Sequence, residues 1–261
     1  MPKTSAHGLV EHTFSSGQFA KILKVADGTP YAHALSVMGI QGPTPTLLVI
    51  GGASHMTAES QAKLIQFFNG PLATLSNQFG ITVLDGGTDA GVIHMMGEAR
   101  QHVRGQFDLI GVAPLEKVIF PGSDSTHAPD DEDPPVELEP HHTHFCLVPG
   151  DTWGSESHWL AGLASALADS SPSITLLING GQISLKDLEV NLQLGRQVTV
   201  IAGSGRLADA VANTISGKMP SEDARIHNLI ATYYPDQISI FDLLSSSLDD
   251  LKAQLKLHFN C

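Results

Sequence analysis

Six short apolar runs recur along the chain and constrain its fold more than any other feature. They are rich in leucine and β-branched residues, and several of them end in glycine. They do not alternate apolar with polar residues, a pattern typical of strands that are buried on both faces. The runs cover residues 46–52, 81–85, 108–113, 144–149, 174–179 and 197–202.

Apolar residues at helical spacing lie between most of these runs. They predict four amphipathic helices. The stripes begin at Val92, Trp159, Leu185 and Leu207 and end at Val103, Leu167, Leu192 and Ile215. Strands that alternate with helices over short links indicate a parallel sheet covered on both sides. We therefore predict a Rossmann-like doubly wound α/β fold with a mostly parallel sheet.

The chain is expected to form one domain, with a core over residues 46–220. Residues 1–45 are predicted to be an extension of this domain, with an extra strand or hairpin over 19–25 and 32–40. Residues 221–261 are predicted to add a strand and a helix that packs on the core. The leucines of this helix recur at Leu244, Leu248, Leu251 and Leu255, and a dimer seam is the alternative interpretation.

An acidic segment over residues 121–139 interrupts the alternation. It combines proline and serine with six carboxylates between residues 130 and 139. Such composition favours a solvated, mobile loop. A lid or an acidic partner-binding segment is the alternative.

Charge and targeting signals limit the possible partners. The 27 acidic residues against 14 lysines and arginines give a formal charge of −13, which argues against nucleic acid or an anionic membrane surface as the partner. Cys146 and Cys261 cannot form a disulfide framework, and no secretory signal or membrane-spanning run is visible. A cytoplasmic protein is expected, with a homo-oligomer or a downstream effector protein as possible partners.

Four glycine-rich turns follow predicted strands, at residues 51–54, 86–91, 179–181 and 203–206. In a doubly wound sheet, ligands bind beyond the carboxyl ends of the strands. Glycine turns expose backbone N–H groups there, and the following helices offer their positive ends, so a phosphate-bearing ligand is predicted. Arg206 would oppose its helix dipole unless a phosphate is bound; a solvent-exposed arginine is the alternative. Neither G-x-G-x-x-G nor the Walker pattern occurs, which disfavours a dinucleotide dehydrogenase and an ATPase motor.

Four strings in these regions resemble a known family. They are GGTDAGVI at 86–93, LIGVAP at 109–114, LEPHHTHF at 138–145 and GSGRLAD at 203–209. Together they resemble the cytosolic N-terminal region of melastatin-type TRP channels, within the prokaryotic TRPM-like branch of the SLOG superfamily, over roughly residues 46–215. The resemblance implies a Rossmannoid domain that senses ADP-ribose or a related NAD-derived nucleotide, with no cofactor required.

The chain also resembles the LOG phosphoribohydrolases of the same superfamily, with departures. Residues 86–92 resemble the G-G-G-x-x-G-L-M signature, and residues 179–187 resemble P-G-G-x-G-T-x-x-E. Asn179 stands in place of the proline, Ile183 of the third glycine, Ser184 of the threonine and Asp187 of the catalytic glutamate. No arginine occurs in the helix predicted over 156–169, where those enzymes carry a catalytic one.

The role of Asp187 stays open. Ser184 and Asp187 match a capping box, which is a structural role. Asp187 could also bind a ligand or act as a catalyst, although aspartate is one methylene shorter than the glutamate that it replaces. No catalytic residue is assigned.

The remaining polar residues that could bind a ligand each have an alternative role. His142 and His144 would share a strand face, but no third ligand stands at fixed spacing, so no metal is expected. His142 is instead predicted to bind the ligand or to order its loop. Glu156 either accepts ribose hydroxyls or simply begins a helix, and Ser204 is predicted to contact a phosphate rather than to act as a nucleophile.

The candidate ligand-binding residues are Gly51, Gly52, Ala53, Ser54, Gly86, Gly87, Thr88, Gly91, Val92, Pro114, His142, Glu156, Asn179, Gly180, Gly181, Gly203, Ser204, Gly205 and Arg206. We predict a nucleotide-sensing domain. A nucleotide phosphoribohydrolase using Glu156 or Asp187 is the first alternative, and a protein-interaction scaffold without a ligand is the second.

Overall fold

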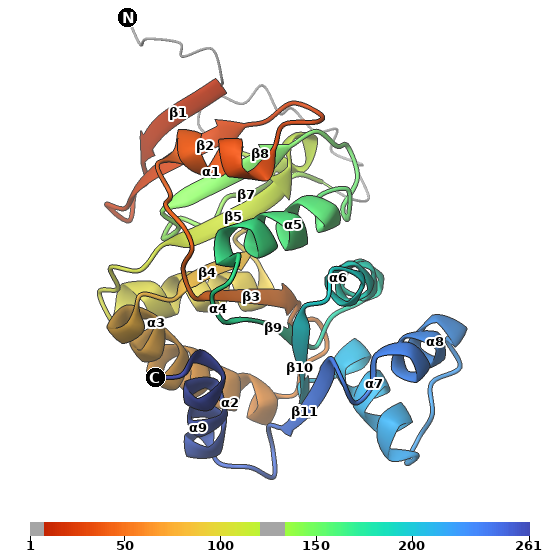
Figure 1. The fold of residues 1–261 in the computed structure, drawn as a ribbon. Coiled ribbons are helices and arrows are strands. Elements are labelled where there is room, and N and C mark those ends of the chain that lie inside the picture. The colour runs from red at the N-terminus through yellow and green to blue at the C-terminus, as the bar shows by residue number, and fades with distance from the viewer. Residues whose placement is uncertain (1–7, 121–133) are drawn as a thin grey trace, which may run out of the picture.

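The computed structural model describes residues 8–120 and 134–261. These residues form a nine-stranded sheet in the order β1-β2-β8-β5-β4-β3-β9-β10-β11 and a small pair, β6-β7 (Figure 1). Strand β1 runs antiparallel to β2, and the other neighbours in the large sheet are parallel. The strands are β1 Gly8–Thr13, β2 Phe19–Lys24, β3 Thr46–Gly51, β4 Thr82–Asp85, β5 Leu109–Pro114, β6 Val118–Ile119, β7 Val136–Glu137, β8 His144–Val148, β9 Ser173–Ile178, β10 Gln197–Ala202 and β11 Ile238–Asp242.

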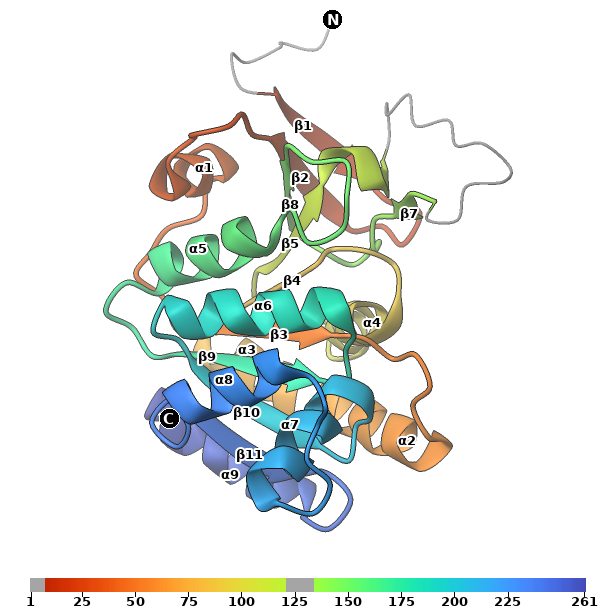
Figure 2. The same cartoon turned by 90° about the vertical axis from the view of Figure 1, so that its right-hand side faces the viewer.

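Helices cover both faces of this sheet (Figures 1 and 2). One layer contains α1 Tyr31–Met38, α5 Ser157–Ala168, α6 Gln182–Gln193, α7 Arg206–Ser216 and α8 Ala224–Tyr233. The other contains α2 Ala58–Phe67, the π-helical turn η1 Phe68–Leu72, α3 Ala73–Phe79, α4 Gly91–His102 and α9 Leu248–Phe259. The 3₁₀ turn η2, Leu115–Lys117, follows β5.

Strand β3 shows why the apolar runs lack alternation. Leu48 and Ile50 pack into the core beneath the layer of α1 and α5, whereas Leu47 and Val49 pack beneath α3 and α4. All four side chains are buried, because successive residues of a strand point to opposite faces and both faces here are covered. The predicted doubly wound α/β fold is confirmed.

The order in which strands are added to the sheet switches sides between β3 and β9. From β3 the chain continues to β4 and β5 on one side, whereas from β9 it continues to β10 and β11 on the other. Strands β3 and β9 are parallel neighbours, paired from Thr46 with Ser173 to Gly51 with Ile178. The loops that follow them diverge, so a crevice is expected beyond their carboxyl ends.

The segment 32–40, predicted as a strand or half of a hairpin, is helix α1. Its buried residues are Ala34, Leu35 and Met38, which lie on one side of a helix. Gly39 ends the helix in the left-handed conformation, φ 80°. The run was too short for its spacing to separate a strand from a helix.

The acidic segment is ordered at its carboxyl end. Residues 121–133, which carry most of the predicted mobile loop, lie outside the described residues. Beyond them, β7 pairs with β6, and Leu138 and Glu139 are buried. The prediction of a solvated loop is therefore wrong for residues 136–139, since the chain has re-entered the fold there.

The C-terminal helix α9 packs on the body of the domain. Leu251, Leu255 and Phe259 are buried in the core beneath α3 and α4, and Leu244 lies before the helix, in the loop after β11. Within residues 8–120 and 134–261, no helix combines the length and apolar character needed to cross a bilayer.

Candidate functional site

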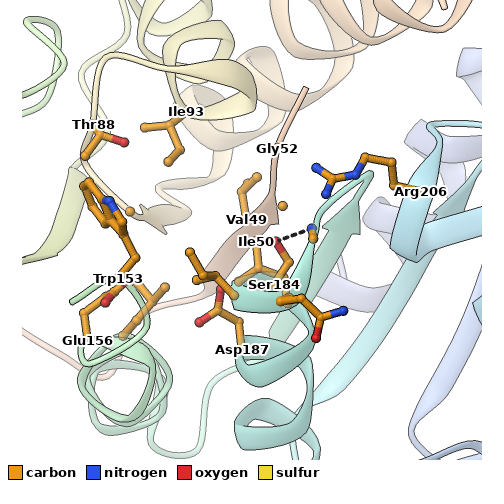
Figure 3. A pocket seen from close by; sticks show the side chains of 16 residues that line it. Val49, Ile50, Gly52, Thr88, Ile93, Trp153, Glu156, Ser184, Asp187 and Arg206 are labelled. Atoms are coloured by element: carbon orange, nitrogen blue, oxygen red, sulfur yellow. Dashed lines mark hydrogen bonds between the residues drawn. The ribbon is translucent and has the colours of Figure 1, made fainter. Parts of the chain in front are cut away.

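A cleft of about 470 Å³ opens at the carboxyl ends of β3 and β9, where the strand order switches sides (Figure 3). This volume lies in the range of about 300–1,000 Å³ that is typical of small-molecule sites. Six segments of the chain contribute to it: the ends of β3 and β4 and the starts of α4, α5, α6 and α7. The lining residues are Val49, Ile50, Gly51, Gly52, Gly86, Thr88, Ile93, Trp153, Glu156, Leu160, Gly181, Gln182, Ile183, Ser184, Asp187 and Arg206.

The turn after β3 places backbone at the floor of the cleft. Gly51 has φ 140°, and a Cβ there would overlap the carbonyl of Ile178 in the neighbouring strand. A Cβ on Gly52 would meet nothing within 4 Å. Gly51 is therefore needed for close packing of β3 against β9, whereas the next residue faces open space.

Arg206 lies at one end of the cleft, at the first position of α7 (Figure 3). A Cβ built on Gly181 would stand 2.8 Å from Arg206 Nη2, so the guanidinium lies over the beginning of α6. The amino ends of two helices and one cation thus meet here. This is the local positive field that an anion requires, whatever the net charge of the whole chain.

Two carboxylates, Glu156 and Asp187, also line the cleft; Figure 3 shows Glu156 on the side away from Arg206 and Asp187 between them, on α6. Glu156 precedes α5 and accepts a hydrogen bond from the Gly154 N–H at 2.7 Å. Burial is the main cause, and the nearby Asp187 carboxylate a smaller one, of a rise in the pKa of Glu156 to about 7. Burial also raises the pKa of Asp187 to about 6, although the Ser157 hydroxyl donates to its Oδ1 at 2.6 Å. Both groups can therefore exchange a proton near neutral pH.

Asp187 does not cap helix α6. The helix begins at Gln182 with Gly181 at the N-cap position, one turn earlier than the pattern Ser184-x-x-Asp187 requires. Ser184 Oγ accepts from the Gly181 N–H at 3.4 Å, and Asp187 lies inside the helix, buried against Ser157 of α5. The prediction that Ser184 and Asp187 form a capping box is therefore wrong, and Asp187 belongs to the wall of the cleft.

The predicted binding residues divide into two groups. Those that line the cleft are Gly51, Gly52, Gly86, Thr88, Glu156, Gly181 and Arg206. Those that do not line it are Ala53, Ser54, Gly87, Gly91, Val92, Pro114, His142, Asn179, Gly180, Gly203, Ser204 and Gly205. Most residues of the second group belong to the same glycine turns, whereas Val92 lies in α4, Pro114 ends β5 and His142 precedes β8. Ligand binding by the first group stays a prediction.

Asn179 and Ser204 hold three of the glycine-rich turns together, those at 51–54, 179–181 and 203–206. The Asn179 amide Nδ2 donates to the carbonyls of Ser54 and Ser204, at 3.1 and 2.8 Å. The Ser204 hydroxyl accepts from the Asn179 N–H at 2.8 Å and donates to the carbonyl of Ile201. Asn179 is 0% and Ser204 1% exposed. The Ser204 hydroxyl is thus used internally, and its contact with a phosphate stays a prediction.

His142 stabilises the turn after β4 through Asp85, the last residue of that strand. Its ring donates from Nε2 to Asp85 Oδ1 at 2.8 Å and from Nδ1 to Glu139 Oε2 at 2.7 Å, and it is 0% exposed. These contacts agree with the alternative, that His142 orders a loop, and its ligand contact stays a prediction. The Gly87 N–H donates to the same Asp85 oxygen at 2.8 Å, so this buried network shapes the glycine turn.

Electrostatics stabilise this network. Burial alone would lower the pKa of His142, but the charges of Asp85 and Glu139 outweigh it and raise the pKa to about 9. Burial likewise opposes ionisation of Glu139, yet hydrogen bonds from His142 and His141 lower its pKa. A protonated imidazole between two carboxylates is the paired state that a buried charge requires.

The apolar wall of the cleft and the start of α6 at Gln182 were not predicted from the sequence. Val49, Ile50, Ile93 and Leu160 fall within apolar runs or helical stripes that are indistinguishable from core in the sequence, and Ile183 stands alone before the stripe that begins at Leu185. Trp153 follows the end of β8 by five residues, and this place near a strand end was the one signal that it could line the cleft. For Asp187, the glycine pair directly before residue 182 was the available signal that α6 starts early.

The fold and the cleft define a class of protein: a doubly wound α/β domain with a ligand-sized crevice at the switch point of its sheet. A family model described as SLOG in TRPM, prokaryote, matches residues 44–251, and the chain belongs to this family. The predicted SLOG and TRPM-like relationship is confirmed.

Curated relatives are cation channels. The chain is 25% identical over 243 residues to transient receptor potential cation channel subfamily M member 2 of Mus musculus, and 24% identical over 273 residues to member 4 of Rattus norvegicus. These alignments cover 80% and 89% of this chain but 16% and 22% of the relatives. The chain therefore spans about a fifth or less of their length.

A solved structure shows the same fold. The X-ray structure of TM1055 superposes with a TM-score of 0.51 at 16% identity and covers 82% of this chain and 99% of its own. At this level of identity the likeness concerns the fold alone.

Proposed function

We propose that this domain binds a nucleotide-derived ligand, of which ADP-ribose is the leading candidate, and acts as a sensor of it. The single observation that carries the proposal is the shared cleft. Glycine turns after two parallel strands, the amino ends of α6 and α7, and Arg206 all border one crevice that also contains two carboxylates. The membership of the family described as SLOG in TRPM is consistent with it.

The two ends of the cleft suit the two kinds of group in such a ligand. Phosphates match the end formed by Arg206 and the start of α6 at Gly181, since anions bind at helix amino ends and pair with guanidinium groups. Ribose hydroxyls match Glu156 and Asp187, because carboxylates accept their hydrogen bonds. Trp153 and the aliphatic wall offer an apolar surface to a base.

The test compares ADP-ribose, AMP and ribose 5-phosphate with adenosine, which lacks a phosphate, by calorimetry and by thermal unfolding. Binding of the phosphorylated ligands and not of adenosine is expected. A ligand present at about 100 times its Kd adds about 2.7 kcal/mol to the free energy of unfolding. Absence of a shift with every phosphorylated ligand would contradict the proposal and favour the scaffold.

The variant Arg206→Gln tests the phosphate end. It should weaken ADP-ribose binding roughly ten- to a hundredfold, because a hydrogen bond to a charged group contributes about 1.5–3 kcal/mol. Adenosine affinity should not change. Arg104→Gln, an exposed arginine outside the cleft, is the matched control for the loss of one positive charge and should bind like the unaltered protein.

A second candidate, nucleotide phosphoribohydrolase activity, is favoured by one observation. Glu156 and Asp187 share the cleft, and burial raises the pKa of both, to about 7 and about 6, values suited to acid–base catalysis. Chromatography of the same incubations decides between the two. A free base released from AMP and abolished by Asp187→Asn would establish the enzyme, whereas binding without product supports the sensor.

A further inference from the structure

A second cluster of polar side chains lies outside the cleft, around the beginning of α4. Asp89 stands in the loop before this helix, His94 lies one turn into it, and Glu139 follows β7. Each of these residues offers one ligand atom, and the three atoms all lie within 4.8 Å of one another. His94 Nδ1 is 2.6 Å from Asp89 Oδ1.

Two further residues extend the cluster. Glu98 lies one turn after His94, on the same face of α4. His141 Nδ1 is 2.6 Å from Glu139 Oε1 and 3.7 Å from Glu98 Oε1. Three carboxylates and two imidazoles therefore meet here, and none of the five residues lines the cleft.

The position of Glu139 is built into the fold. A Cβ on Gly97 would overlap the Glu139 carboxyl group, so glycine at this point of α4 admits the carboxylate against the helix. Glu139 is 0% exposed, and the N–H of His141 donates to its Oε2 at 2.9 Å. This buried carboxylate is thus held beside the helix face that carries His94 and Glu98, while Asp89 and His94 are reached from solvent.

The donor set selects a class of ion. Imidazole nitrogen combined with carboxylate oxygen suits zinc and its first-row neighbours, whereas magnesium and calcium prefer oxygen alone. Bonds of about 2.0–2.2 Å require the donor atoms to lie roughly 3–4 Å apart. The donor atoms must therefore approach by up to about 1–2 Å, which rotation of the exposed side chains of Asp89 and His94 allows.

We propose that Asp89, His94 and Glu139 bind a divalent first-row transition ion of the zinc type, with His141 and Glu98 beside it. The ion would join the loop between β4 and α4 to the segment after β7. The proposal is independent of the nucleotide proposal, because it uses none of the cleft residues. It also goes against the expectation from the sequence, which considered only the histidines at 141–144 and found no third ligand.

The test uses the full chain after removal of metals with a chelator. Titration with Co²⁺ is followed by visible absorption, and Zn²⁺ is then added as a competitor. We expect uptake of one Co²⁺ per chain with d–d bands, displaced by Zn²⁺ but not by an equal concentration of Mg²⁺. No Co²⁺ spectrum, or displacement by Mg²⁺, would overturn the proposal.

Variants assign the ion to this cluster. His94→Ala and Asp89→Asn should each weaken Co²⁺ binding at least about tenfold, and both side chains are exposed enough that folding, checked by circular dichroism, should persist. His102→Ala removes an exposed imidazole from the end of the same helix and should bind Co²⁺ unchanged. Equal binding by His94→Ala, Asp89→Asn and the unaltered protein would place the ion elsewhere and overturn the proposal.

Discussion

Glu156 and Asp187 illustrate how tertiary burial changes the chemistry of single residues. Both are 7% exposed, and burial keeps a proton on each to a higher pH than in the unfolded chain. Between about pH 4 and 7 the unfolded chain binds fewer of these protons than the folded one. The free energy of unfolding contributed by the pair is therefore present at low pH and falls as the pH rises through this window.

Glu156→Gln should remove the share of this pH dependence that belongs to Glu156. The pKa changes from 4.5 to about 7, and one unit corresponds to 1.36 kcal/mol. Relative to the unaltered protein, the variant should therefore gain roughly 3 kcal/mol of stability between pH 4.5 and pH 8. Urea unfolding at both pH values measures this difference, from which the titration of groups that do not interact with Glu156 cancels.

Glu116→Gln is the control for this measurement, because Glu116 is an exposed glutamate outside the cleft. Its stability relative to the unaltered protein should be the same at both pH values. A pH-independent difference for Glu156→Gln as well would show that burial does not perturb this carboxylate.

At the scale of elements, the turn after β3 separates two glycines that look alike in the sequence. Both glycines line the cleft, but only Gly51 also belongs to the strand pair β3–β9. The sequence predicted both as ligand contacts because each follows an apolar strand. Only the register of β3 against β9 assigns them different roles.

Gly51→Ala should destabilise the fold by about 3 kcal/mol, since its Cβ would overlap the Ile178 carbonyl and φ 140° is unfavourable for alanine. Gly52→Ala, the matched control, should change the free energy of unfolding by no more than about 0.5 kcal/mol, because open space surrounds it. Denaturant unfolding of both variants checks this. Equal losses in the two variants would contradict the distinction.

At the scale of the whole molecule, α9 joins the end of the chain to its first half. Leu251, Leu255 and Phe259 pack in the same core cluster as Leu47 and Leu64, and α9 contacts η1 and β9. In Figure 1 this last helix lies beside α2 and α3, with the C-terminus next to them. The helix therefore stabilises the sheet face on which α3 and α4 also pack.

Leu255→Ala should reduce the free energy of unfolding by about 2–5 kcal/mol, the range for large-to-small core substitutions, because Leu255 is 3% exposed. Leu257→Ala lies two residues away in the same helix, but Leu257 is 80% exposed, and its change should stay within about 0.5 kcal/mol. Thermal and urea unfolding of the two variants measure the contrast. A neutral Leu255→Ala would show that α9 does not contribute to this core.

The sequence by itself determined the fold class, the six central strands, the four helices between them and the edge where their glycine turns meet. These features depend on local patterns: burial on both faces removes alternation along a strand, and a helix repeats its apolar face every three to four residues. The tertiary structure alone decided that Asp187 faces the cleft, that His142 and Ser204 do not, and that Glu139 reaches α4. Those outcomes depend on strand order, on register and on where α6 begins, which are set by contacts between residues far apart in the chain.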